Sequence, residues 1–103
     1  MNPEISVIIA AYNVQDYISH CITSLLNQTF ANWEAIIYDD GSTDSTVNVV
    51  MNHNDFRIKL IKGCINQGIG IARQCAFAQS SGKYIYILDA DDWIEKDPFE
   101  IML

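Results

Sequence analysis

Residues 5–13, Ile-Ser-Val-Ile-Ile-Ala-Ala-Tyr-Asn, decide how this chain begins to fold. Residues 5–11 form a nearly continuous apolar run, which ends at the pair Tyr12-Asn13. A short run of this kind is typical of a β-strand that is covered on both faces. The segment therefore predicts a buried first strand that delivers Tyr12 at its carboxyl end.

The spacing of apolar residues along the sequence changes directly after this strand. Apolar residues recur at spacings of three and four, which predicts an amphipathic helix from Asp16 to Gln28. The apolar stripe consists of Ile18, Cys21, Ile22, Leu25 and Leu26. Residues 35–38 then predict a second buried strand, and residues 39–42, Asp-Asp-Gly-Ser, favour a turn and a helix cap. The inner face of the following helix is expected to carry Val47, Val50 and Met51.

The alternation of strands and helices continues to residue 88. Residues 57–62 alternate charged and apolar side chains, which favours a strand at the edge of a sheet. A turn at residues 66–68 leads into a helix, and residues 84–88 predict a fourth strand. The inner face of that helix is expected to carry Ile69, Ala72, Cys75 and Ala76.

Four strands separated by helices predict an α/β fold, an open parallel sheet with helices on both faces. Right-handed crossovers, with the charged third strand outermost, favour the strand order 3-2-1-4. Residues 97–100 look like the opening of another helix, with a capping Asp and a Pro at the first helical position. Because the sequence stops at Leu103, we expect the chain to be truncated.

The composition of the chain limits which partners, cellular location and cysteine chemistry can be expected. The 103 residues include 13 acidic and 6 basic side chains, a net charge of −7, so binding to nucleic acid through a basic surface is not expected. No apolar run approaches the roughly 18 residues of a membrane span, and no signal peptide is recognisable, which predicts a cytoplasmic location. Cys21, Cys64 and Cys75 have no C-x-x-C spacing and are expected to be reduced, packed thiols.

Acidic residues follow two of the predicted strands. In an open parallel sheet, ligands bind beyond the carboxyl ends of the strands where the strand order reverses, here beside the first strand. Tyr12, the pair Asp39-Asp40 and residues 89–92, Asp-Ala-Asp-Asp, should meet there. If the fourth strand stays extended, Asp89 and Asp91 share a face and Asp92 points away. By the same alternation, only one of Asp39 and Asp40 can face the crevice.

Clustered carboxylates repel one another unless a positive charge lies between them. Oxygen ligands suit Mn²⁺ or Mg²⁺, which take one or two carboxylates and complete their shell with waters and substrate phosphates. Such an ion would join an acidic protein to a diphosphate. An acidic turn that is merely solvated, or that caps a helix, is an equally weighted alternative at this stage.

Five stretches in order resemble motifs of family 2 glycosyltransferases, which have the GT-A fold. The resemblance covers almost the whole chain, in residues 6–13, 28–34, 39–44, 66–73 and 82–92. It implies a Rossmann-like GT-A sheet and identifies residues 1–103 as the part that binds a nucleotide sugar. It also implies an enzyme of polysaccharide biosynthesis. Such an enzyme moves a sugar from a nucleotide-diphosphate donor, a UDP-sugar, to a hydroxyl of a saccharide or lipid-linked acceptor, with inversion.

Residue roles follow from the same resemblance. Asp40 would hydrogen-bond the base, and the floor and stacking surface of its pocket would be formed by Ala10, Ala11 and Tyr12. Asp91 would bind the metal as part of a DXD motif, with Asp89 on the ribose or the metal shell. Ala90 belongs to the nucleotide-binding set, Arg73 would steady the acids or a phosphate, and Asp92 is a further candidate ligand. The alternatives are purely structural roles: Tyr12 ends a strand, Arg73 is solvated, and Trp33 and Trp93 pack in the core.

The resemblance has two limits. Ala10 stands where the family commonly has Pro, and Gln74 follows Arg73 where Asn is usual. The family's catalytic base lies beyond the acidic segment, so no catalytic residue is expected before Leu103, and the acceptor half is expected to be absent. A donor-binding or interaction fragment without catalysis therefore stays open as an alternative function. Apolar surface exposed by truncation would favour a homo-oligomer.

Three other α/β families fit the sequence less well. A nicotinamide-binding domain would need a third glycine where Arg73 stands, and its motif would follow the first strand. A response-regulator receiver would carry acids where the first strand ends in Tyr12-Asn13. A haloacid-dehalogenase-type phosphatase could begin at Asp89 but would need much more chain after it.

Overall fold

The computed structural model describes residues 3–63 and 65–92. Four strands and three helices alternate along the chain. The strands are β1 (Ile5–Ala11), β2 (Trp33–Asp39), β3 (Ile58–Lys62) and β4 (Tyr84–Ile87). The helices are α1 (Ile18–Leu26), α2 (Thr46–Met51) and α3 (Ile69–Ala78).

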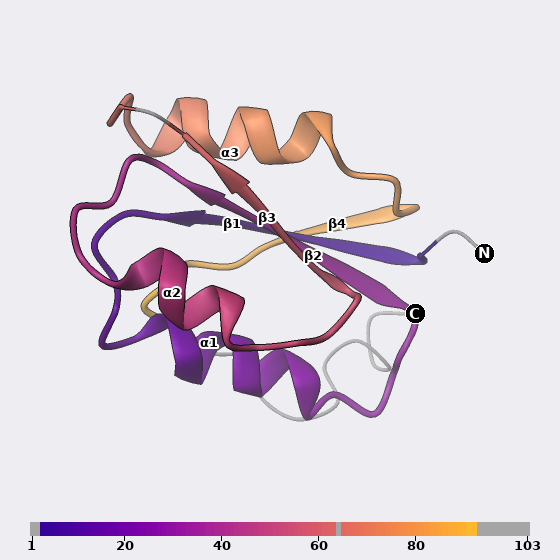
Figure 1. The fold of residues 1–103 in the computed structure, drawn as a ribbon. Coiled ribbons are helices and arrows are strands. Elements are labelled where there is room, and N and C mark those ends of the chain that lie inside the picture. The colour runs from indigo at the N-terminus through magenta and orange to yellow at the C-terminus, as the bar shows by residue number, and fades with distance from the viewer. Residues whose placement is uncertain (1–2, 64, 93–103) are drawn as a thin grey trace.

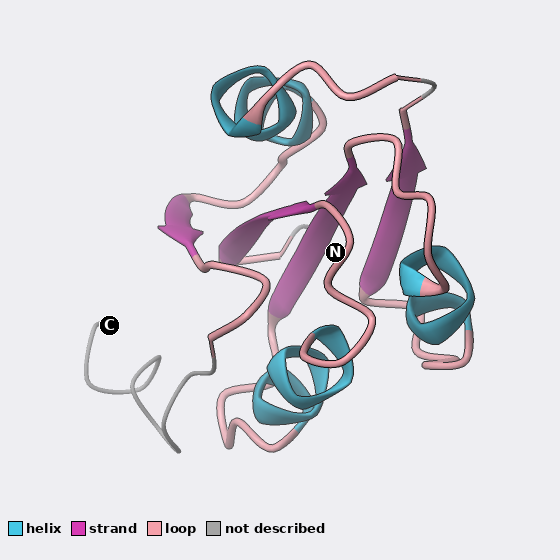
Figure 2. Ribbon diagram, turned by 90° about the vertical axis from the view of Figure 1, so that its left-hand side faces the viewer, coloured by secondary structure: helices cyan, strands magenta, loops and turns pink. Residues whose placement is uncertain are grey.

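The strands form one parallel sheet in the order β3-β2-β1-β4. This order and the open α/β architecture confirm the prediction from the sequence, since right-handed crossovers leave few other arrangements. Figure 1 shows α3 on one face of the sheet and α1 and α2 on the other. The three layers are also separate in the view along the sheet in Figure 2.

Each face of the sheet has its own apolar cluster. On the face of α1 and α2, alternate residues of β1 pack with buried residues of both helices, among them Ile22, Leu25 and Val50. On the opposite face, Ile8, Ile36 and Tyr38 pack against Ala72 and Ala76 of α3. The two alanines are small, so the helix backbone can approach the sheet closely.

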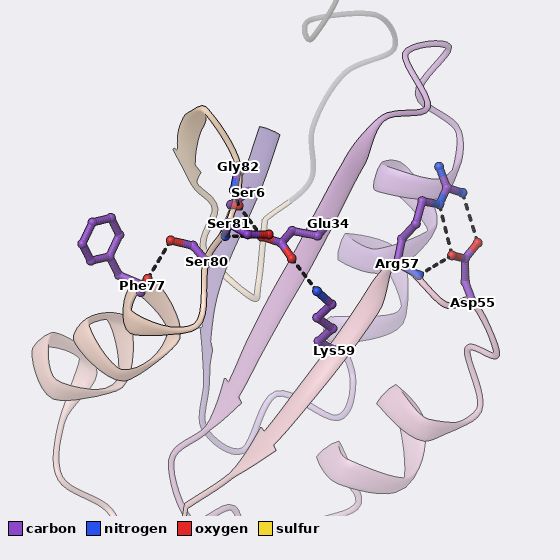
Figure 3. A network of polar contacts seen from close by, with 9 residues as sticks. All are labelled: Ser6, Glu34, Asp55, Arg57, Lys59, Phe77, Ser80, Ser81 and Gly82. Atoms are coloured by element: carbon purple, nitrogen blue, oxygen red, sulfur yellow. Dashed lines mark hydrogen bonds and ion pairs between the residues drawn. The ribbon is translucent and has the colours of Figure 1, made fainter. Parts of the chain in front are cut away.

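A polar cluster around the buried residues Ser6 and Glu34 interrupts the apolar face beneath α3 at the amino ends of the strands (Figure 3). The Glu34 carboxylate accepts hydrogen bonds from Ser6 Oγ at 2.5 Å and from Lys59 Nζ at 2.6 Å. It also accepts the Ser81 backbone N–H at 2.7 Å. Ser6 Oγ in turn accepts the Gly82 N–H at 2.7 Å, so the cluster connects β1, β2, β3 and the segment that enters β4.

The helices differ from the sequence prediction in their ends and faces. The first helix is shorter than Asp16–Gln28, because Val14 O accepts the N–H groups of Tyr17 and Ile18 in a turn that precedes α1. Met51 is 60% exposed, so its predicted place on the inner face is wrong, whereas Val50 is buried as predicted and Val49 packs against the same apolar cluster. Ile69 is also wrong as an inner-face residue, because it is 56% exposed at the start of α3.

Several further expectations can be compared with the described residues. Trp33 is buried in the core, and the Arg57 guanidinium lies 4.1 Å from the centroid of its ring. Cys21 and Cys75 are free cysteines, buried and half-buried respectively.

Within residues 3–63 and 65–92, no helix has the length and hydropathy that crossing a bilayer would require. The predicted helix opening at residues 97–100 and the packing of Trp93 lie outside the described residues.

Candidate functional site

A cavity of about 490 Å³ lies at the carboxyl ends of β1, β2 and β4. Residues from four separate parts of the chain meet there, and they include every residue that the sequence assigns to the nucleotide or metal site except the further candidate Asp92. Asp39 and Asp92 are not among the lining residues. The lining consists of Ala10, Ala11, Tyr12, Val14, Asp40, Asn66, Gly68, Ile69, Ala72, Arg73, Asp89, Ala90 and Asp91.

The adjacent residues Asp39 and Asp40 have different partners although both are 3% exposed. The Asp39 carboxylate accepts the Ser42 N–H at 3.1 Å and the Ser42 hydroxyl at 2.5 Å, which closes the turn after β2. The Asp40 carboxylate instead accepts the backbone N–H groups of Gln67 at 3.0 Å and Gly68 at 2.8 Å. Of the two, only Asp40 lines the cavity, as the alternation of side chains along a strand suggests.

The loop before α3 packs closely on the turn after β2. Gly41 has a φ of +79°, and a Cβ atom there would lie 2.8 Å from the carbonyl carbon of Ile65. A side chain at Gly41 would therefore push the loop away, and the backbone conformation itself favours glycine. Together with the two amides held by Asp40, this contact fixes residues 65–68, of which Asn66 and Gly68 line the cavity.

The acidic segment after β4 is a turn, so the expected extended geometry is wrong. The strand ends at Ile87, and the Asp92 N–H donates to Asp89 O at 3.0 Å. Asp89 and Asp91 nevertheless both line the cavity, and Asp92 does not. The grouping predicted from the alternation of an extended strand is produced instead by the curvature of the turn.

Arg73 provides a positive charge inside the cavity. Its Nη2 lies 2.7 Å from Oδ1 of Asp89, and both side chains are partly exposed. Arg73 comes from the second turn of α3, so helix and acidic turn are joined at the rim. Within the described residues, the exposed Asp91 carboxylate has no hydrogen-bond or ion-pair partner, which leaves it available to a ligand.

The electrostatic effect of the acidic turn is visible at a buried thiol beneath it. Burial raises the pKa of Cys21 to about 12, with further increases from the negative charges of Asp92, Asp91 and Asp89. The Cys21 thiol donates to Asp89 O at a sulfur–oxygen distance of 3.8 Å. The thiol is therefore neutral at physiological pH and can act neither as a thiolate ligand nor as a nucleophile.

The donor set fits a metal ion that is only partly held by protein. The described parts of the chain contain no group of three or more His, Cys, Asp or Glu side chains placed to hold a metal. Mg²⁺ and Mn²⁺ sites that carry a diphosphate need only one or two carboxylates, because phosphate oxygens and waters complete the shell. Asp91, with Asp89 beside it, meets that requirement at the rim of a cavity large enough for a small ligand.

Five lining residues were given no role in the site from the sequence: Val14, Asn66, Gly68, Ile69 and Ala72. The turn at residues 66–68 was recognised as a motif, but its packing against the turn after β2 depends on a contact between distant residues. One available signal was that a turn between a strand and the next helix lies at the carboxyl edge of a parallel sheet.

The chain is similar to a known protein family and to proteins of that family. A family model described as Glycosyl transferase family 2 matches residues 6–103. An uncharacterized glycosyltransferase of Haemophilus influenzae is 41% identical over 103 residues, covering 98% of this chain and 41% of that protein.

Two solved structures have the same fold. The crystal structure of S. aureus TarS 1-349 in complex with UDP has a TM-score of 0.92 and 32% identity, covering 99% of this chain and 31% of that one. The mannosyltransferase PcManGT from Pyrobaculum calidifontis, in complex with GDP-Man and Mn²⁺, has a TM-score of 0.81 and 25% identity, covering 90% and 29%. The chain thus spans less than half the length of each of these relatives.

Proposed function

This chain belongs to glycosyl transferase family 2, and on that basis we propose that its cavity binds the nucleotide diphosphate of a sugar donor. The full protein would transfer the sugar to an acceptor hydroxyl of a saccharide or a lipid-linked saccharide. The observation that carries this proposal is the convergence of Tyr12, Asp40 and Asp91 on one cavity. Its position at the carboxyl edge of β1 is where open parallel sheets bind ligands.

The base would occupy the part of the cavity formed by the end of β1. Ala10 and Ala11 leave room for a flat ring, and Tyr12, which is 44% exposed, offers an aromatic face for stacking. The Asp40 carboxylate already accepts two backbone N–H groups and has lone pairs left for an N–H of the base. We propose uracil, since the similar TarS structure contains UDP.

The diphosphate would lie across the acidic turn. Asp91, with Asp89, would hold Mn²⁺ or Mg²⁺, which supplies positive charge to the phosphates and stabilises the leaving group. Arg73 is placed to keep Asp89 in position or to contact a phosphate oxygen directly. The complex of PcManGT with GDP-Man and Mn²⁺ supports a metal in this role.

The chain's own residues would bind and orient the donor, and none of the described ones is placed as the base that deprotonates the acceptor. We propose that this base lies after Leu103, in the length that the relatives have and this chain does not span. An inverting displacement needs that group on the acceptor side of the sugar. General-base catalysis contributes about 10²- to 10⁴-fold to such reactions.

Isothermal titration of the chain with UDP, with and without MnCl₂, tests the proposal. We expect MnCl₂ to tighten binding at least about tenfold, which corresponds to about 1.4 kcal/mol. Asp91→Asn should remove most of that gain and leave the metal-free affinity nearly unchanged. Asp16→Asn, a change of an exposed acid outside the cavity, is the matched control and should behave like the wild type. Absence of UDP binding, or equal binding with and without metal, would contradict the proposal.

A further inference from the structure

The loops that follow β1 and β2 are linked by reciprocal hydrogen bonds at the cavity. The Asn13 N–H donates to Ser42 Oγ at 2.9 Å, and the Thr43 N–H donates to Asn13 Oδ1, also at 2.9 Å. The two partners are about 30 residues away in sequence. Asn13 is therefore bound through its backbone and its side chain to the same turn.

The linkage extends over the next two residues. The Val14 N–H donates to Thr46 Oγ1 at 2.9 Å, and the Gln15 N–H donates to Asp44 Oδ2 at 3.3 Å. In return, the Ser45 N–H donates to Gln15 Oε1 at 2.9 Å. Three consecutive backbone amides after Tyr12 thus have side-chain acceptors from one segment, residues 42–46.

Asn13 has an unusual backbone conformation at this point. Its φ is +52°, and among the described residues it is the only non-glycine with a positive φ. Asparagine tolerates this left-handed region better than most residues because its short polar side chain can hydrogen-bond locally, whereas alanine is destabilised there by the contact of its Cβ with the backbone. The bonds to Ser42 and Thr43 hold Asn13 in that conformation.

The chain bends at Asn13 directly after Tyr12, which lines the cavity. Within the described residues, no hydrogen bond holds the Tyr12 hydroxyl, and its side chain is 44% exposed. The Cα–Cβ direction from which the ring extends is set by the backbone, and no hydroxyl bond to a described residue corrects it. An aromatic ring stacks on a planar ligand only over a narrow range of orientations.

We propose that Asn13 is a positioning residue that fixes the orientation of Tyr12 at the nucleotide cavity. The left-handed turn at Asn13, held by Ser42 and Thr43, presents the Tyr12 ring before the ligand arrives, so that binding does not have to order it. The effect on nucleotide affinity rests on the function proposed above, whereas the effect on the ring of Tyr12 does not depend on any ligand.

Three variants separate the two contributions of Asn13, which are its side-chain hydrogen-bond acceptor and its tolerance for a positive φ. Asn13→Ala removes the side-chain acceptor and disfavours the positive φ. Asn13→Gly removes the acceptor and keeps the φ accessible. Asn13→Asp keeps both an acceptor for the Thr43 N–H and a tolerance for the left-handed region. Asn48→Ala, at an exposed position in α2, is the matched control.

The first measurement needs no ligand. In NMR spectra of the chain with ¹³C-labelled tyrosine, the Tyr12 ring signals, assigned with Tyr12→Phe, should shift and broaden in Asn13→Ala. They should return to wild-type positions in Asn13→Asp, with Asn13→Gly between the two. Unchanged Tyr12 signals in folded Asn13→Ala or Asn13→Gly would overturn the proposal. This result would not depend on whether UDP binds.

The second measurement is a double-mutant cycle on the affinity for UDP with Mn²⁺. Asn13→Ala should weaken binding about tenfold in the wild-type background. In the background of Tyr12→Ala the same change should have little further effect, because the group on which Asn13 acts is gone. Equal losses in both backgrounds would show that Asn13 does not act through Tyr12. If the wild type itself fails to bind UDP, the proposed function fails and the ring signals still decide the role of Asn13.

Discussion

At the scale of single residues, the adjacent pair Asp39 and Asp40 shows how similar side chains acquire different tasks. The two are equally buried and each accepts two hydrogen bonds. The partner of Asp39 is Ser42, three residues away, as the Asp-Asp-Gly-Ser sequence suggests. The partners of Asp40 are Gln67 and Gly68. Those contacts could not be predicted from the sequence because they depend on how two loops pack.

The difference between the two aspartates gives a matched pair of variants. Asp40→Ala and Asp39→Ala should each lower the free energy of unfolding by about 1–3 kcal/mol, since each breaks two partly buried hydrogen bonds to a carboxylate. Only Asp40→Ala should weaken UDP binding, by about tenfold or more, because only Asp40 lines the cavity. Urea denaturation and calorimetry measure the two effects. Equal losses of affinity would show that the cavity-facing position of Asp40 has no special role.

At the scale of strands and helices, the sequence predicted every element that the structure describes, and most errors concern ends and faces. Periodicity located the strands because each one is a short, dense apolar run. It misplaced Met51 and Ile69, since a helix of two turns, or the first residue of a helix, has too few neighbours to define a face. It also gave no sign of the polar cluster around Glu34, whose partners come from three other segments (Figure 3).

The Glu34 cluster makes the stability of the sheet dependent on pH. Burial alone would raise the pKa of Glu34, but hydrogen bonds from Lys59, Ser6 and Ser81 outweigh it and lower the pKa to about 2. A carboxylate with a lowered pKa in the folded state stabilises the protein above its ordinary pKa of 4.5. That stability is lost as the pH falls from about 4.5 toward 2.

The expected contribution of ionised Glu34 is about 3 kcal/mol at neutral pH. Glu34→Gln should lower the free energy of unfolding at pH 7 by roughly that amount and flatten its decline between pH 5 and pH 3, which urea denaturation at several pH values measures. Glu4→Gln, at a half-buried position just before β1, serves as the control and should keep the wild-type decline. An unchanged slope in Glu34→Gln would show that other groups cause the acid sensitivity.

At the scale of the whole molecule, the strand order is what brings the site together. With β1 between β2 and β4, the ends of all three strands lie side by side, so residues 12, 40 and 91 reach one cavity. This convergence could be predicted because parallel strands with right-handed crossovers have few arrangements. The turn at residues 89–92 and the binding of residues 67 and 68 by Asp40 could not be predicted, since both depend on hydrogen bonds specific to this structure.

If the 103 residues bind the donor and the catalytic base lies elsewhere, as proposed, the 103-residue chain should bind a donor but transfer its sugar poorly. Release of UDP from UDP-sugars, followed in a coupled assay with and without saccharide acceptors, should stay near the background rate, because the proposed base lies after Leu103. The matched comparison is a longer relative assayed in the same way, such as S. aureus TarS 1-349. Rapid turnover by the 103-residue chain would place the base within it.

The central claim is that three distant strand ends bind one nucleotide diphosphate through a metal, and NMR with Mn²⁺ tests it most directly. In ¹⁵N-labelled chain with UDP, trace Mn²⁺ should broaden the amide signals of residues 89–92 first, while UDP shifts those of Tyr12, Asp40 and Gly68. The broadening at residues 89–92 should be weaker without UDP, because the diphosphate supplies part of the metal's shell. Broadening centred elsewhere, or UDP shifts away from the carboxyl edge of the sheet, would contradict the account.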